Sequence, residues 1–165
     1  MATSPKSGEK TPDPQQLPAQ KAQREPQDAA YVRAQDAIAT ARTSDASDLT
    51  LSGDDFSDLT ELPPDIGTLT ALTDLSLSRT PVSDISALSG LTALSGLSLL
   101  GTPVNDLSPI LPLTQLVDAP KYGGLAFRNT AAARADRRIA KIAGIQDDAQ
   151  RATDLCAYLK NVTPT

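Results

Sequence analysis

The side chains best suited to catalysis and metal binding are scarce in this chain. It has no histidine and one cysteine, Cys156, among 165 residues. Histidine is the commonest acid–base group and metal ligand near neutral pH, so both kinds of site lack their usual residue. A single cysteine allows no intrachain disulfide, and neither of the common glycine-rich patterns for phosphate binding occurs. We therefore expect a protein that is not an enzyme, with no cofactor and no metal ion.

Two pairs of adjacent carboxylates are the remaining candidates for metal chemistry. The pairs are Asp54–Asp55 and Asp147–Asp148. Neither has the spacing of a calcium-binding helix–loop–helix site. Asp147–Asp148 is explained more simply as the start of a helix, where a carboxylate faces the free backbone N–H groups. Both pairs are interpreted as solvent-exposed charges.

Cys156 is the only candidate nucleophile of its kind, and it lies in the segment "DLCAYLK". The apolar positions around it are spaced as on one face of a helix, and Cys156 falls on that face. A thiol among apolar neighbours is stabilised in its neutral, unreactive form. We expect a packed and inert cysteine.

The net charge of −5 divides unevenly along the chain. Residues 45–119 carry eleven Asp or Glu and one Arg, a net charge of −10, whereas residues 120–165 carry a net charge of +4. An acidic middle disfavours nucleic acid as a partner, because it repels phosphates. The simplest interpretation of the division is solubility together with attraction between neighbouring segments.

The first residues offer little to bury. Residues 1–27 are rich in Pro, Gln, Ser and Lys, a composition that predicts a disordered tail. No apolar run of seven residues occurs in the first 30 residues, and nowhere does an apolar run approach 18 residues. We therefore expect neither a secretory signal nor a membrane span, and a soluble, cytoplasmic protein.

A repeat dominates the middle of the chain. Residues 69–90 read "LTALTDLSLSRTPVSDISALSG", and residues 91–112 read "LTALSGLSLLGTPVNDLSPILP"; 12 of the 22 aligned positions are identical. In each copy two leucines alternate with a serine, as at Leu75 and Leu77, which predicts a short strand with leucines on one face. A unit this small cannot close a core alone, so the units are expected to stack and share one.

These repeats resemble bacterial leucine-rich repeats, in the 22-residue form similar to internalins. The usual Asn after the strand is replaced here by Thr80 and Thr102, whose hydroxyls can still bond to the neighbouring backbone turn. Asp84 and Asp106 recur at one position, and we expect each to cap the short turn that follows it. The resemblance implies a solenoid with parallel strands along a concave face.

The array extends beyond the two clear copies. Leu49 and Leu51 begin a first, irregular repeat with an insertion of about four residues, because Leu51 precedes Leu77 by 26 residues rather than 22. Downstream, "LTQLVDAP" starts a fourth unit that is then abandoned. The predicted fold is thus an α/β solenoid of three to four coils, over residues 44–119.

Helices are predicted on both sides of the array, where a solenoid needs caps. Residues 28–43 form an N-terminal helix with Asp28 as a possible N-cap, and residues 120–165 form a C-terminal helical cap. In that cap, Asn129 or Thr130 starts a helix that stops at Gly144, and Asp147 starts a second. The segment "YGGLAFRNT" at 122–130 could be a loop or an edge strand.

The outward-pointing strand residues are the candidate binding residues. Families with this architecture bind proteins or peptides on the concave face, so the resemblance implies a non-catalytic protein–protein interaction module. The surface is small, hydroxyl-rich and acidic toward one edge, which favours a basic protein or peptide and neither nucleic acid nor membrane. The candidates are Asp48, Thr50, Ser52, Asp74, Ser76, Ser78, Gly96, Ser98 and Leu100.

Other interpretations stay open at this point. The basic C-terminal helices offer a second binding surface, and the chain could be a bacterial effector delivered to a host through residues 1–27. It could also be the regulatory fragment of an enzyme, such as an effector ubiquitin ligase. The catalytic cysteine of those ligases lies in a Cys-x-Asp motif, however, and here Tyr158 occupies the position of the Asp.

Overall fold

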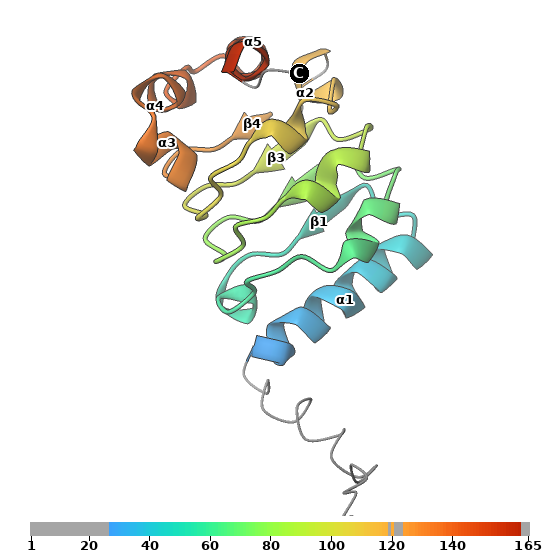
Figure 1. Cartoon of the computed structure of the whole chain (residues 1–165). Helices are drawn as coiled ribbons and strands as arrows, with labels where there is room; N and C mark the ends of the chain where they lie inside the picture. The colour runs from blue at the N-terminus through green and yellow to red at the C-terminus, as the bar shows by residue number, and fades with distance from the viewer. Residues whose placement is uncertain (1–26, 119, 121–123, 163–165) are drawn as a thin grey trace, which may run out of the picture.

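The computed structural model describes residues 27–118, 120 and 124–162, so that all but the last residue of the predicted tail lies outside the described residues. The described chain is a mixed α/β structure with one parallel four-stranded sheet, five α-helices and four short 3-10 helices, labelled η (Figure 1). The elements are α1 (Gln27–Thr43), β1 (Asp48–Thr50), η1 (Asp54–Phe56), η2 (Pro64–Thr68), β2 (Asp74–Ser76), η3 (Ser86–Gly90), β3 (Gly96–Ser98), η4 (Ser108–Ile110), α2 (Gln115–Asp118), β4 (Leu125–Ala126), α3 (Ala131–Ala135), α4 (Arg137–Ala143) and α5 (Asp148–Val162).

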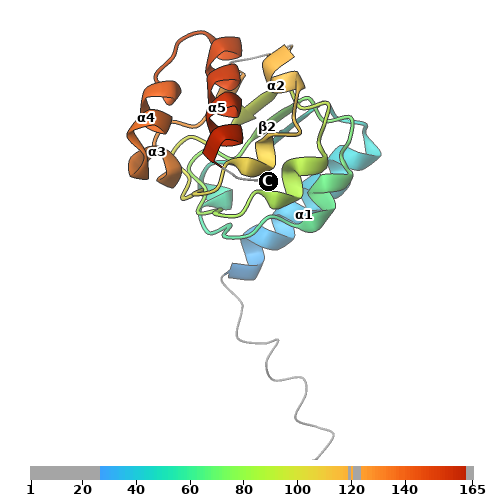
Figure 2. The same cartoon turned by 45° about the horizontal axis from the view of Figure 1, so that its top comes forward.

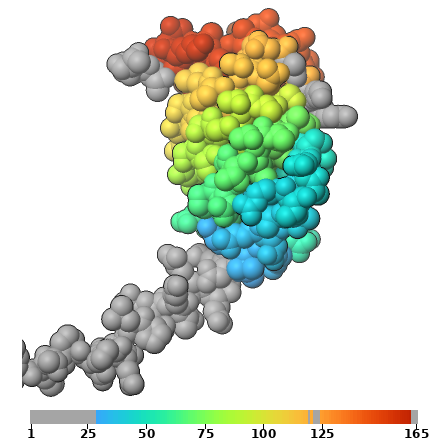
Figure 3. Space-filling model, turned by 90° about the vertical axis from the view of Figure 1, so that its right-hand side faces the viewer, coloured from blue at the N-terminus to red at the C-terminus, as the bar shows by residue number. Residues whose placement is uncertain are grey.

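The sheet has the simplest possible order, β1-β2-β3-β4, with every neighbouring pair parallel. It does not close on itself, so β1 and β4 are its edges. Equivalent residues pair across the strands, as in the row Leu49, Leu75, Leu97 and Leu125. In the space-filling view, successive segments follow one another as layers from α1 to the C-terminal helices (Figure 3).

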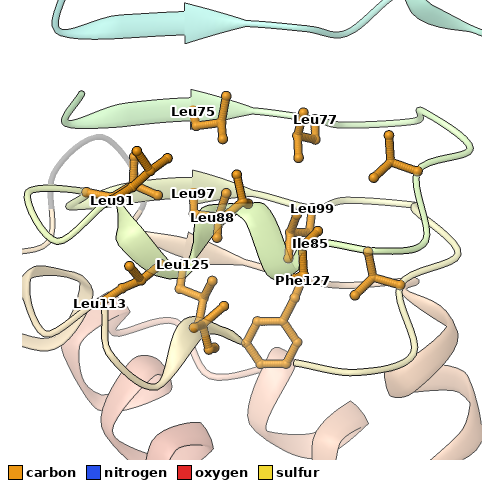
Figure 4. Packing of buried hydrophobic residues seen from close by; sticks show 14 of the residues in the cluster. Leu75, Leu77, Ile85, Leu88, Leu91, Leu97, Leu99, Leu113, Leu125 and Phe127 are labelled. Carbon is orange, nitrogen blue, oxygen red and sulfur yellow. The ribbon is translucent and has the colours of Figure 1, made fainter. Parts of the chain in front are cut away.

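Leucines fill the interior as the repeat predicts. Leu75 and Leu77 lie on the same side of their strand, and Leu97 and Leu99 lie alongside them (Figure 4). Each of the four is at most 2% exposed. Burying a leucine side chain contributes about 1.5–3 kcal/mol, so these rows are a main source of stability.

The segments opposite the sheet also stack on one another. η2, η3 and η4 pack in sequence order, and each contributes one buried aliphatic side chain: Ile66, Leu88 and Ile110. The approach of η2 to η3 is so close that a Cβ on Gly67 would lie 2.9 Å from the Ala87 carbonyl oxygen. Glycine is therefore required at that position by contact rather than by its torsion angles.

The turn after each strand has a common geometry. A residue with positive φ lies in every one of them: Gly53, Arg79, Gly101 and Asn129, with φ between 60° and 90°. Glycine and asparagine enter this region at least cost, and Arg79 is the exception.

A threonine follows this residue in the last three of the four turns. The hydroxyls of Thr80, Thr102 and Thr130 each donate to the carbonyl three residues earlier, at 2.8, 2.9 and 3.0 Å. The predicted bond between the threonine hydroxyl and the backbone turn is confirmed.

The two repeated aspartates cap the turns that follow them. The Ser86 N–H donates to Asp84 Oδ1 at 2.8 Å, and the Ser108 N–H donates to Asp106 Oδ1 at the same distance. The first of these bonds lowers the pKa of Asp84 below its usual value, because the backbone N–H stabilises the carboxylate. The capping prediction is thus confirmed at both positions.

Helix α1 packs against the β1 edge of the sheet. It contacts β1, η1 and η2, and it buries Ala30, Ala34, Ile38 and Ala41 at helical spacing. The helix begins at Gln27, so Asp28 lies inside it rather than at its N-cap.

The fourth unit continues further than the sequence suggested. Leu113 and Leu116 are buried, and the chain then forms α2 and returns to the sheet as β4. Within "YGGLAFRNT", Leu125 and Ala126 form the edge strand β4, and the other described residues do not; Tyr122 and Gly123 lie outside the described residues. The unit is therefore not abandoned after Leu116. Its strand follows β3 by six residues more than the 22-residue period, which is why the period alone did not reveal it.

The helix predicted from Thr130 to Gly144 is two helices. Thr130 does cap α3, but the backbone becomes extended at Asp136, and α4 starts after it. Asp136 accepts from the N–H groups of Arg138 and Ile139, and this competing N-cap breaks the helix. As a result Ala135 is exposed instead of sharing the buried face of Ala132 and Ile139.

The ends of the last two helices agree with the predicted residues. Gly144 follows the last residue of α4, with a φ of −81° rather than the left-handed value common at such stops. Asp147 accepts from the Gln150 N–H at 2.7 Å and so caps α5. Helices α4 and α5 lie side by side (Figure 2), at the β4 end of the sheet (Figure 1).

Candidate binding surface on the sheet

The outer face of the sheet, meaning the side away from the leucine core, carries short side chains in register. One row across the strands is Asp48, Asp74 and Gly96, and the next is Thr50, Ser76, Ser98 and Ala126. These rows line a hollow of about 340 Å³. A hollow of this size is within the usual range for ligand sites, so the surface has a shape that can receive a partner's side chains.

Seven of the nine predicted residues line the hollow: Asp48, Thr50, Asp74, Ser76, Gly96, Ser98 and Leu100. Ser52 and Ser78 do not line it. Each lies two residues past the end of its three-residue strand; Leu100 has the same position after β3 but does line the hollow.

Two residues at the last strand line the hollow although the sequence analysis did not select them. They are Gly124, which directly precedes β4, and Ala126, which extends the row of Ser76 and Ser98 by one strand. The signal for them was present in "LAFRNT", residues 125–130, which has the spacing of "LSLSRT" at 75–80. Phe127 takes the place of the second leucine, and Thr130 takes that of Thr80.

The hollow deepens from β1 toward β4. Asp48 and Thr50 are exposed, Asp74 and Ser76 are half-buried, and Gly96 is buried. At the deep end, a Cβ on Gly124 would lie 2.8 Å from the Asp148 Cβ, so this position has no room for a side chain. Gly96 also has no side chain, so the backbone of β3 itself lines the hollow there.

The charge of the hollow comes from the aspartates of β1 and β2. Asp74 accepts from the Thr73 hydroxyl at 2.8 Å. Over the part of the chain that the structure describes, neither Asp48 nor Asp74 forms an ion pair. Two adjacent carboxylates without a cation favour a partner that brings one.

Hydroxyl groups hold one another in place beside these carboxylates. The Ser78 and Ser98 oxygens lie 2.8 Å apart, and the Ser76 hydroxyl donates to Ser78 at 3.4 Å. Ser78 thus bonds to Ser76 and Ser98, which line the hollow, although Ser78 itself does not line it. The bonds fix side chains that are already short, which lowers the entropy lost when a partner binds.

The other residues selected for chemistry lie apart from this surface. Asp147 caps α5 and Asp148 pairs with Arg151, whereas Asp55 lies 3.8 Å from Arg33 in an exposed pair. No group of three His, Cys, Asp or Glu residues within the described ranges could hold a metal ion.

Cys156 is half-buried on α5, and it lines a groove of about 370 Å³ between α2 and α5. Burial raises the pKa of its thiol, since the thiolate loses solvation, and nearby Lys160 opposes the shift. A raised pKa keeps the thiol in its neutral form, which is the unreactive form that the sequence analysis led us to expect.

Comparisons with known proteins add no relative: no protein family matches the chain, and no curated protein matches it. Among the described helices, none combines the length and the apolar character that crossing a membrane requires.

Proposed function

We propose that this chain is a non-catalytic protein–protein interaction module, built as a short leucine-rich repeat solenoid of about four coils. Its ligand is a basic segment of a partner protein that binds in the hollow on the outer face of the sheet. The observation that carries the proposal is the hollow itself, which has in-register rows of short polar side chains and two aspartates outside any described ion pair.

Three periodic features support the repeat architecture. The four strands are parallel and in register, the turns share a residue with positive φ, and η2, η3 and η4 pack on one another in order. Each feature recurs once per unit, as expected when a single supersecondary unit is stacked. On this interpretation the outer face of the sheet is the concave face.

The composition of the hollow indicates how a partner is held. Among the described residues that line it there is no Trp, Tyr or Arg, the residues that most often dominate binding energy at interfaces. The partner must therefore supply the large side chains, and the hollow supplies shape and two negative charges. Leu100, which is 39% exposed, is the most exposed leucine among the described residues that line it.

The proposal is tested by affinity capture from a native lysate with a Ser76→Arg, Ser98→Arg double variant. Arginines at these positions fill the hollow and offset the charge of its two aspartates, so we expect a captured partner to bind at least tenfold more weakly, about 1.4 kcal/mol. The matched control is Ser86→Arg, Ser89→Arg, which adds the same two charges to exposed positions of η3.

A partner that both variants retain equally would contradict the placement of the site on the sheet. A partner that both lose equally would show that net charge alone governs capture, which also contradicts it. For a partner lost only with the first variant, Asp48→Asn, Asp74→Asn should weaken binding by about two- to tenfold and reduce its salt dependence.

A further inference from the structure

A second hollow lies at the C-terminal end of the molecule, between α4 and α5. It has a volume of about 510 Å³, and its wall includes Ile142, Ile145 and Tyr158. All three are half-buried, so part of each apolar surface stays open to solvent. The two helices lie side by side (Figure 2). The residues that line this groove line neither the groove between α2 and α5 nor the hollow on the sheet. It is therefore a surface distinct from the outer face of the sheet.

The rim of this α4–α5 groove is positively charged. Arg138 and Lys141 are exposed and lie three residues apart on α4, which places them on one face of the helix. Neither forms an ion pair within the described ranges. The groove thus has two cations, and no described carboxylate forms an ion pair with either of them.

The two carboxylates near these cations are bonded to other groups. Asp136 accepts from the Tyr158 hydroxyl and from the Arg138 and Ile139 N–H groups at the start of α4. Asp154, which lines the groove, accepts from the Gln150 side-chain amide at 2.6 Å. The Tyr158 ring is therefore fixed as a wall by its own hydroxyl.

We propose that the α4–α5 groove binds an acidic peptide segment of a protein partner, with a large apolar side chain of that segment seated against Ile142, Ile145 and Tyr158. Carboxylates on either side of this side chain reach Arg138 and Lys141. The combination of an apolar wall and a cationic rim selects both properties in one segment, since neither an all-acidic nor an all-apolar peptide satisfies both surfaces.

Charge also favours a short acidic segment over a nucleic acid. Residues 45–119 carry a net charge of −10, and a long polyanion crossing the molecule would meet them. A segment of a few residues confines its charge to the groove, because at physiological salt interactions are screened beyond about 8 Å.

The test is fluorescence anisotropy with three labelled octapeptides and the full chain. The probe is EEDFEELE; EEDSEESE lacks the apolar side chains, and QQNFQQLQ lacks the charges. We expect the probe to bind more tightly than either control, by about fivefold or more given two exposed ion pairs and one apolar contact. Its affinity should fall as salt is raised.

Variants locate the binding on the molecule. Arg138→Glu, Lys141→Glu should weaken the probe about tenfold, because two attractive pairs become repulsive. The matched control Arg42→Glu, Lys160→Glu changes the net charge equally at exposed positions of α1 and α5 outside this groove. Circular dichroism establishes that each variant is folded, and Ile145→Ser provides a second, uncharged probe of the wall.

Several results would overturn the proposal. They are equal binding of the probe and EEDSEESE, equal loss in both double variants, or retention of the probe by Arg138→Glu, Lys141→Glu. A labelled dT8 oligonucleotide that binds more tightly than the probe, and loses affinity with that double variant, would assign the groove to nucleic acid instead. Concentration-dependent sedimentation of the chain alone, abolished by the same variant, would assign it to a second copy.

Discussion

The sheet and the C-terminal helices hold their surfaces in place by different means. The outer face of the sheet is defined by backbone register and by side chains of at most four heavy atoms, above rows of leucine. The α4–α5 groove is defined by long side chains and by polar anchors such as Arg151. The first surface is rigid because its core is repetitive, whereas the second depends on a few specific bonds. The comparison predicts that damage to the core affects the whole molecule and that damage to an anchor stays local.

The largest expected effect comes from the leucine core. Leu99 is fully buried between the rows of β2 and β4, so Leu99→Ala should lower the free energy of unfolding by about 2–5 kcal/mol. Denaturant unfolding measures it. Because every layer packs on the next, amide exchange should accelerate in β1 and β2 as well as in β3.

Leu100→Ala is the matched control for this change. The neighbouring residue Leu100 is 39% exposed, so its truncation should cost no more than about 1 kcal/mol. If amide exchange in Leu99→Ala is faster in β3 alone, with β1 and β2 unaffected, the idea that the layers unfold as one unit is contradicted.

An intermediate effect is expected at Arg151, the charged anchor of α5. Its guanidinium donates to the Leu125 carbonyl at 2.6 Å and to the Ile145 carbonyl at 2.5 Å, and it also pairs with Asp148. Arg151→Met keeps the apolar stem but leaves these acceptors unpaired, at a cost of about 1–3 kcal/mol. Amide exchange should accelerate in α5 and β4 while the amides of β1 and β2 keep their protection.

Lys160→Met is the control for the loss of a cation on the same helix. Lys160 is exposed, so the change should stay within about 0.5 kcal/mol. If Arg151→Met accelerates exchange uniformly over the molecule, the C-terminal helices and the sheet form one cooperative unit, and the contrast between the two regions is wrong.

The sequence predicted the repetitive region better than the anchored one. The alternation at Leu75 and Leu77 recurs 22 residues later, so strands, buried rows and most residues of the hollow could be assigned by position. For β4 the sequence analysis left a loop and an edge strand open, because six extra residues shift this strand and Phe127 replaces a leucine. A search at the fixed 22-residue period misses this strand, although "LAFRNT" at 125–130 keeps the spacing of "LSLSRT" at 75–80.

The helical end was harder to predict because its bonds join residues with no sequence pattern. Alanines and isoleucines at helical spacing run on through Asp136, and nothing in that spacing marks the side-chain cap that breaks the helix. The contacts of Arg151 with Leu125 and of Tyr158 with Asp136 span 26 and 22 residues. Both depend on how α5 packs, which only the folded chain determines.

The smallest effect tests one anchor by its pH dependence. The Tyr158 hydroxyl, then the Arg138 N–H, lower the pKa of Asp136 below its ordinary value of 3.8. A lowered pKa in the folded state adds stability above the unfolded value, and that stability is lost as the pH falls through the folded value. Tyr158→Phe removes the larger cause, so the pKa of Asp136 should rise toward 3.8 while staying below it.

The measurement is an NMR titration of the Asp136 carboxyl group, together with unfolding at neutral and acidic pH. The stability difference between the wild type and Tyr158→Phe should be present at neutral pH and shrink as the pH falls through the folded pKa of Asp136. The same bond raises the pKa of Tyr158, so its share of stability is present below the ordinary tyrosine value near 10 and is lost above it. Tyr31→Phe on α1, at the other end of the molecule, is the control, and an unchanged Asp136 titration in Tyr158→Phe would show that the hydroxyl does not anchor α5 to α4.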